Sequence, residues 1–398
     1  MKILTSSLIA ASLLTSLSAE SLGDAFKNGT VSGEIRAMYV SDSDINVEGY
    51  GVGGSVGYTT ADYKGLSAGV TFYTVHGLGG ADEETADTLL LNGKESASML
   101  GQAYLQYKLS NTVFKVGRQQ IDTPLAGSDD IRLVPNLFEA ALIINSDLPN
   151  TTLIAGHVSK MMGFVDGPGD RFHHMSDASP AGGIVSNEGV SVVAGIYSNE
   201  DIGIDAQLWD YYAHEVLNAV YFDLTYSVSD FSVAGQYYTY SELGQVEDAS
   251  IKVGYDVFGA QGTYSNGDLG LDLTLAYNKV GDSDMGVSVF GTWGGYPEFV
   301  YADETWFYSF GTGAQDAQAY SLALDYACTK IEGLGLTLKY IGFDLNEDYG
   351  SKDVDIIDVI ASYEVNDNMA LSATYENGTS DDTAFERDVF KIGATYSF

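Results

Sequence analysis

The last stretch of the chain, DVFKIGATYSF (residues 388–398), alternates between apolar and polar or small side chains. The apolar positions are Phe390, Ile392, Ala394, Tyr396 and Phe398. Successive side chains of a β-strand point to opposite faces, so the stretch predicts a strand with one apolar and one polar face. Such a strand fits a membrane barrel, in which one face meets lipid and the other lines a wet interior. A half-buried strand of a soluble sheet is the alternative.

The same alternation recurs along the chain, for example in residues 102–109, 220–228, 334–340 and 357–365. About eighteen such segments can be counted, and no segment is apolar for the roughly 20 residues that a membrane-spanning helix needs. They begin near Thr30, Gly51, Gly65, Ala97, Thr112, Leu137, Thr151, Val190, Ile202, Glu215, Phe231, Ser250, Leu269, Ala319, Gly333, Val354, Asn368 and Phe385. We therefore predict an all-β fold, a transmembrane antiparallel β-barrel of about 18 strands.

The lengths of the connections support this prediction. Counted from the first strand, the even-numbered connections are tight turns that carry Asn, Asp or Gly, such as SNGDL and VNDN. The odd-numbered connections are mostly longer and include residues 77–96, 121–136, 161–189 and 281–317. Short periplasmic turns and long external loops are typical of outer-membrane barrels. A soluble sandwich gives no reason for loop length to depend on parity.

The first residues, MKILTSSLIAASLLTSLSAE, combine an early lysine, a short apolar run and small residues near position 19. This pattern predicts a signal peptide over residues 1–19, cleaved after Ser18 or Ala19. Residues 20–398 then form one barrel domain. We expect the chain in the outer membrane of a Gram-negative bacterium. The terminal Phe398 resembles the last residue of bacterial outer-membrane barrels, which the barrel assembly machinery recognises.

The composition excludes several functions. The formal net charge is −37, so nucleic acid would be repelled and cations attracted. Of the five histidines, most lie in or near predicted loops, and none is accompanied by a serine in a nucleophile-elbow motif. We therefore expect no enzyme and no cofactor. Asp42, Asp44 and Glu48 are weak candidates for a calcium site, because the glycine that such a loop needs is missing. The acidic loops are expected to bind Ca²⁺ or Mg²⁺ that bridges them to lipopolysaccharide.

One long connection is unusually charged. The stretch KVGRQQIDTPLAGSDDIRLVPNLFE (residues 115–139) leaves a predicted strand and carries two prolines, several acids and two arginines before the next strand. A barrel of about eighteen strands leaves an aqueous channel that needs narrowing if solutes are to be selected. An inward fold of residues 121–136 would narrow it. Arg118 has the parity of the lipid face, and a bulge or strand end at Gly117 would turn it inward.

This stretch resembles a motif of the OprD-type outer-membrane porins, and GTVSGEIRAMY near residue 30 is similar to the first strand of that family. The resemblance is strongest over Gly117–Gln119, Thr123–Leu125, Arg132–Leu133, Pro135 and Phe138. It implies passive, substrate-selective uptake, with the third external loop as part of the constriction. It also implies a ladder of arginines along one wall, although the chain has only five arginines. The version in this chain is most similar to those of ε-proteobacteria.

The candidate pore residues follow from strand parity and from this loop. The basic candidates are Arg36, Lys115, Arg118, Arg132, Lys252, Lys339 and Lys391. The acidic candidates are Glu34, Asp223 and Asp325 on strands, and Asp129 and Asp130 on the loop. Facing basic and acidic walls would orient a dipolar solute; alternatively, these charges only hydrate the wall and pair with each other.

We therefore predict an outer-membrane porin with a narrowed aqueous channel for passive diffusion of small polar nutrients or ions, with a preference for cations. It would act as a monomer or a homotrimer. A general diffusion porin and a surface protein or adhesin that displays acidic loops are the alternatives.

Overall fold

A computed structural model describes most of the chain. It covers residues 19–43, 47–78, 96–129, 132–163, 172–175, 188–250, 252–283, 293–304, 316–344, 353–381 and 386–398. The predicted signal peptide lies almost entirely outside the described residues, so its cleavage stays a prediction. No helix in the described residues is long and apolar enough to cross a membrane.

Most of the described residues lie in β-strands. Two short helices, α1 (Leu22–Lys27) and α2 (Gly244–Asp248), accompany them. The strands are β1 (Thr30–Asp42), β2 (Val47–Thr59), β3 (Leu66–Gly77), β4 (Ala97–Leu109), β5 (Thr112–Gln119), β6 (Leu137–Asn145), β7 (Thr151–Met162), β8 (His173–His174), β9 (Val190–Asn199), β10 (Ile204–Ala213), β11 (Leu217–Val228), β12 (Phe231–Glu242), β13 (Tyr255–Asn266), β14 (Leu271–Ser283), β15 (Gln318–Ala327), β16 (Leu334–Asp344), β17 (Val354–Asn366), β18 (Met369–Ser380) and β19 (Arg387–Ser397).

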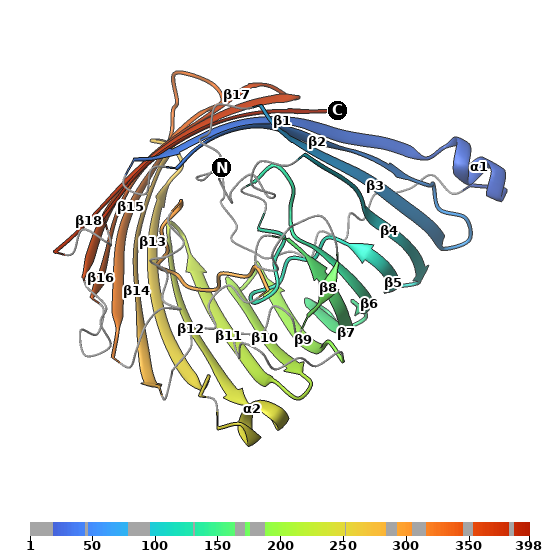
Figure 1. Ribbon diagram of the computed structural model, residues 1–398, viewed down its shortest axis with the longest axis horizontal. Helices are drawn as coiled ribbons and strands as arrows, with labels where there is room; N and C mark the ends of the chain where they lie inside the picture. The colour runs from blue at the N-terminus through green and yellow to red at the C-terminus, as the bar shows by residue number, and fades with distance from the viewer. Residues whose placement is uncertain are drawn as a thin grey trace.

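These strands form one closed antiparallel sheet (Figure 1). The two-residue β8 pairs only with β7, and the other eighteen strands pair in chain order. The last strand returns to the first, in a register that runs from Glu34 opposite Ser397 to Asp42 opposite Val389. Beyond this ladder, the backbones of Gly33 and Phe398 exchange two hydrogen bonds of 3.0 Å. The predicted barrel of about 18 strands is confirmed.

The alternation of side chains separates an outer from an inner face. On β16, Leu336, Leu338 and Tyr340 are 42%, 51% and 39% exposed, whereas Lys339 and Ile341, at the alternate positions, are buried. On β19, the predicted apolar face is likewise exposed, with Ile392 at 45%. The large exposed apolar side chains are thus the lipid-facing surface of the barrel.

The connections follow the predicted parity with two exceptions. The even-numbered connections are short, as between β11 and β12, where Ser229 adopts a positive φ of 52° in a two-residue turn. The odd-numbered connections are mostly long, but only residues 43–46 join β1 to β2, and only residues 214–216 join β10 to β11. We call the two ends of the barrel the short-turn end and the long-loop end.

The hydrophobic core lies inside the barrel. It gathers inward-facing aromatic residues of the wall, such as Trp209, Tyr211 and Tyr238, with Trp293 and Val300 from the connection between β14 and β15. A second cluster joins Tyr73 and Val75 of β3 to Leu133 and Val134. Leu133 and Val134 belong to the connection between β5 and β6. Figure 1 shows segments of this connection and of the connection between β14 and β15 crossing the interior of the barrel. The lumen is therefore partly filled by the chain itself.

The two faces of β16 predict opposite responses to the same substitution. Leu338→Arg places a charge on the lipid face near the middle of the strand, and we expect it to destabilise the folded barrel by about 2–4 kcal/mol. Thr337→Arg places the same side chain on the inner face, where Thr337 Oγ1 donates to Asp325 Oδ1 at 2.5 Å, and should cost much less. Urea unfolding in phospholipid vesicles measures both, and equal losses of stability would contradict the assignment of faces.

Candidate functional site

The connection between β5 and β6 folds into the barrel as a compact, self-bonded segment. The Thr123 backbone N–H and hydroxyl both donate to the carbonyl oxygen of Ala126, at 2.8 Å each. The backbone N–H of Ser128 donates to Asp122 Oδ1 at 3.0 Å. The Leu125 N–H donates to the hydroxyl of Tyr211 on the wall at 3.4 Å. The charged stretch therefore has a defined shape inside the lumen, as its sequence predicted.

Arg132 is the most deeply buried charge of this segment. Only 1% of Arg132 is exposed, and its Nη2 lies 2.7 Å from Asp129 Oδ2. Arg36, on β1, donates from Nη1 to the carbonyl oxygen of Arg132 at 2.8 Å and from Nη2 to Glu34 Oε2 at 3.0 Å. Four predicted pore residues, Glu34, Arg36, Asp129 and Arg132, are thus brought together. They fix the segment to the wall, so Arg132 is a structural charge rather than one exposed to solute.

A second inward segment, residues 293–304, comes from the connection between β14 and β15. Gln236 on β12 binds it twice, donating to the Pro297 carbonyl at 2.6 Å and accepting from the Phe299 N–H at 3.1 Å. Asn278 on β14 accepts from the Val300 N–H at 2.9 Å. Tyr238 donates its hydroxyl proton to Glu298 Oε1 at 2.5 Å. One wall of the barrel therefore holds the middle of this segment by four side-chain hydrogen bonds.

The end of the same segment is held by strands β16 to β19. Lys339 forms an ion pair with Asp303 and lies 4.1 Å from the ring centroid of Tyr301. Lys391 pairs with Glu304 Oε2 at 3.1 Å, and the Glu304 N–H donates to Glu376 Oε2 at 2.9 Å. The predicted pore lysines Lys339 and Lys391 thus bind the chain itself.

The two inward segments also pack on each other. The Gly127 N–H donates to the Trp293 carbonyl at 3.1 Å, and the Tyr296 hydroxyl donates to Asp129 Oδ2 at 3.3 Å. Gly294 has a positive φ of 76°, and a Cβ there would lie 2.2 Å from the Asn136 side chain. This close approach requires glycine. The segments therefore form one assembly across the lumen, which we call the plug.

Burial changes the acid–base behaviour of two plug carboxyls. Burial raises the pKa of Glu298 to about 7, although the hydrogen bond from Tyr238 opposes the shift. Burial also raises the pKa of Glu304 to about 7, against the attraction of Lys391. Both groups change charge near neutral pH.

Two predicted basic residues lie on β5, outside the plug. Lys115 stacks on Tyr104, with Nζ 4.1 Å from the ring centroid. Arg118 pairs with Glu139 at 2.9 Å, lies 4.2 Å from the centroid of Phe172, and keeps 40% of its side chain exposed. The expected bulge or strand end at Gly117 is not found, because β5 continues to Gln119 in unbroken register. Gly117 instead adopts a φ of 124°, which glycine tolerates. Arg118 therefore shares the outward face of Phe114 and Val116, and its prediction as a pore residue is wrong.

Acidic residues lie across the barrel from Arg36 and Lys115. Asp223 on β11 accepts from Gln207 Nε2 at 2.6 Å and from the Tyr221 hydroxyl at 2.8 Å. Asp325 on β15 lies directly across from Asp272 on β14. Nine strand pairings separate β1 from β11, and nine separate β5 from β15, which is half of the eighteen-strand circumference. Arg36 therefore stands opposite the strand of Asp223, and Lys115 opposite that of Asp325.

The remaining predicted residues take no part in the plug. Lys252 does not lie on a strand, because β13 begins only at Tyr255; this prediction placed the strand start too early. Asp130 and Asp44 lie outside the described residues. Asp42 lies 3.8 Å from Arg387, and Glu48 accepts from Tyr39 and Tyr50. Within the described parts of the chain, no three His, Cys, Asp or Glu side chains are grouped to hold a metal ion.

Sequence reasoning missed the second segment of the plug. It also missed the residues that hold it, Gln236, Tyr238 and Asn278. The sequence does contain a sign that this segment is buried. The stretch WGGYPEFVY (residues 293–301) holds four aromatic residues, more than a solvent-exposed loop needs.

Comparison with known proteins agrees with this architecture. The solved structures with the same fold include *Pseudomonas aeruginosa* OccD3 (OpdP), with a TM-score of 0.74 and 17% identity over 93% of this chain and 91% of that one. *P. aeruginosa* OpdK with vanillate has a TM-score of 0.76 and 15% identity over 94% and 99%. A BenF-like porin from *Pseudomonas fluorescens* Pf-5 has a TM-score of 0.75 and 15% identity over 94% and 99%.

No curated protein matches the sequence significantly. The model of the OprD family of outer-membrane porins matches residues 65–365, which is most of the chain. The chain therefore belongs to the OprD family of outer-membrane porins.

Proposed function

We propose that this porin is a selective channel for passive diffusion of small polar solutes and ions, with a preference for cations. The observation that carries this proposal is the plug, which spans the lumen and is fixed to several strands by hydrogen bonds and ion pairs. A general diffusion pore has no need of such a barrier. Passage along the remaining water-filled path requires no catalytic chemistry and no cofactor.

The charges of the wall support selection of dipolar or cationic solutes. Lys115 on β5 faces the arc that carries Asp272 and Asp325, so a transverse field acts on a solute between them. OpdK has been solved with vanillate, so a channel of this fold can hold a small organic ion. Arg36 and Arg132 are engaged by the chain's own backbone and carboxylates, and Arg118 pairs with Glu139. We therefore infer that solutes bearing an ammonium group pass more readily than simple carboxylates.

Planar-bilayer recording tests the proposal. We expect single channels with a reversal potential in a KCl gradient that favours K⁺ over Cl⁻. A barrel that only displays surface loops would pass no current, and a clear chloride preference would refute the cation preference.

The acidic arc predicts the effect of one neutral substitution. Asp325→Asn removes a charge whose interaction with an ion 10 Å away in water is about 0.4 kcal/mol, attractive for K⁺ and repulsive for Cl⁻, so the ratio of K⁺ to Cl⁻ permeability should fall about fourfold. Asp367→Asn, in the turn between β17 and β18, is the matched control and should leave the ratio unchanged. A larger effect of the control would place the selective charges outside the lumen.

The docking of the plug predicts a second effect. Gln236→Ala removes two hydrogen bonds to the backbone of residues 297 and 299, each worth about 1 kcal/mol, so the segment should leave the lumen more often. Single-channel conductance should rise and become noisier. Gln261→Ala on β13 is the control, since Gln261 makes no hydrogen bond to the plug among the described residues. An unchanged conductance for Gln236→Ala would show that this segment does not limit the current.

The raised pKa values predict a dependence on pH. The pKa of Glu298 and Glu304 is about 7 when the plug is docked, whereas a free glutamate has a pKa near 4.5. Docking therefore favours the neutral form of both groups. It is strongest below about pH 4.5 and weakens as the pH rises toward 7. Their ionisation also adds negative charge to the lumen. We expect conductance and K⁺ preference to rise between pH 5.5 and 8.5. Glu298→Gln should reduce this rise, and a rise of the same size in the variant would contradict the role of Glu298.

A further inference from the structure

A cluster of polar side chains lies at the long-loop end of β9, away from the plug. Ser191 Oγ is 3.1 Å from His214 Nε2 and 3.2 Å from His157 Nδ1. His214 Nδ1 in turn lies 3.5 Å from Glu188 Oε2. A hydroxyl, an imidazole and a carboxylate thus stand in one row.

This cluster faces outward. On β7, Leu153 is 43% exposed and Ile154 and Val158 are buried, and on β9, Val193 is 55% exposed and Val192 is buried. His157 and Ser191 share the parity of the exposed residues and pair with each other across the two strands. Polar and ionisable groups on a lipid-facing wall are costly, so their presence there points to a function. The channel does not use them.

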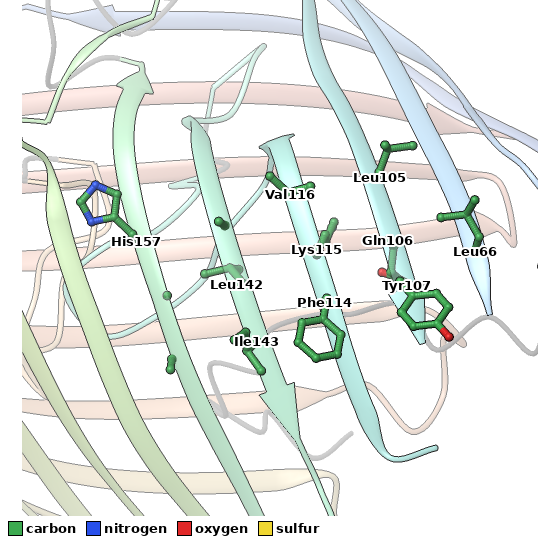
Figure 2. Close-up of a pocket in the computed structure, with 13 residues that line it drawn as sticks. Leu66, Leu105, Gln106, Tyr107, Phe114, Lys115, Val116, Leu142, Ile143 and His157 are labelled. Atoms are coloured by element: carbon green, nitrogen blue, oxygen red, sulfur yellow. The ribbon is translucent and has the colours of Figure 1, made fainter. Parts of the chain in front are cut away.

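An apolar groove leads to the cluster along the outer wall (Figure 2). Its volume is about 460 Å³, and His157 lies at one end of its lining and Leu66 at the other. Bulky exposed side chains such as Phe114 and Ile143 flank the small residues Ala141 and Ala155. A groove of this chemistry suits a hydrocarbon chain.

We propose that Ser191, His214 and Glu188 form a nucleophilic site for carboxylic esters of membrane lipids, whose acyl chain lies in the groove. When Nε2 of His214 accepts the Ser191 proton, Nδ1 carries a proton and faces Glu188, which orients the ring. His157 flanks the hydroxyl on its other side, with Nδ1 3.2 Å from Ser191 Oγ, and holds that hydroxyl in place.

The reaction balances with water as the second substrate. Ser191 Oγ attacks the acyl carbonyl while its proton moves to His214, and the ester C–O bond then breaks with return of that proton to the leaving alcohol. Water attacks the acyl-serine in the same way and releases a fatty acid. No oxidant, metal or other co-reactant is consumed.

Covalent labelling tests the nucleophile. The full-length barrel, folded in detergent micelles and verified by its heat-modifiable migration on gels, is treated with an alkyl fluorophosphonate. We expect phosphonylation at Ser191, located by peptide mass spectrometry, and labelling slowed on the order of a thousandfold in His214→Asn. Ser159→Ala is the matched control, because Ser159 lies on β7 beside His157 but donates to the carbonyl of Glu139. No label on the folded barrel, or equal labelling of Ser191→Ala, overturns the proposal.

A second variant tests the lipid substrate. Ala155→Trp fills the groove and should abolish release of fatty acid from phosphatidylethanolamine vesicles, while labelling by a short fluorophosphonate persists. Labelling of the wild type without release of fatty acid would overturn the assignment of lipid esters. Channel conductance of Ser191→Ala should equal that of the wild type, so failure of this proposal is distinguishable from failure of the channel function.

Discussion

Lipid offers no hydrogen-bond partner to a peptide group, and the rest of the structure depends on this constraint. An open sheet would leave the edges of β1 and β19 unpaired in the hydrocarbon. Their pairing, from Glu34 opposite Ser397 to Asp42 opposite Val389, removes both edges. Closure then creates an inside and an outside, and the alternation of side chains along every strand assigns each residue to water or to lipid.

Because the sheet is closed, the long connections can fold into a water-filled interior. The plug satisfies its polar groups with inward-facing side chains of distant strands rather than with its own backbone ladder. Its buried ion pairs, Arg132 with Asp129 and Lys391 with Glu304, contribute little net stability because desolvation offsets their attraction. These ion pairs instead fix the position of the plug, because a displacement of a few ångströms would leave the charges unpaired. The position of the plug is therefore set by charges that are buried within it.

The parts of this architecture that depend on local pattern could be predicted from the sequence. The strands follow from period-two alternation, and the parity of Glu34, Arg36, Asp223 and Asp325 follows with them. The inward fold of residues 121–136 was suggested by their charge density. The position of Lys252 could not be predicted, because a chain of alternating residues does not show where pairing begins. The docking of residues 293–304 could not be predicted either, because Gln236 lies 61 residues from Pro297 and no local signal joins them. Ser191 and His214 are separated by 23 residues, and only the pairing of strands brings the hydroxyl to both imidazoles.

The attachments of residues 293–304 have a consequence for biogenesis. The segment is fastened at one point to β12 and β14 and at another to β16 and β19, the last strand to be synthesised. The contacts of Glu304 with Glu376 and Lys391 cannot form before the final hairpin, β18 and β19, has been synthesised. The segment is therefore fully attached only when the cylinder is complete.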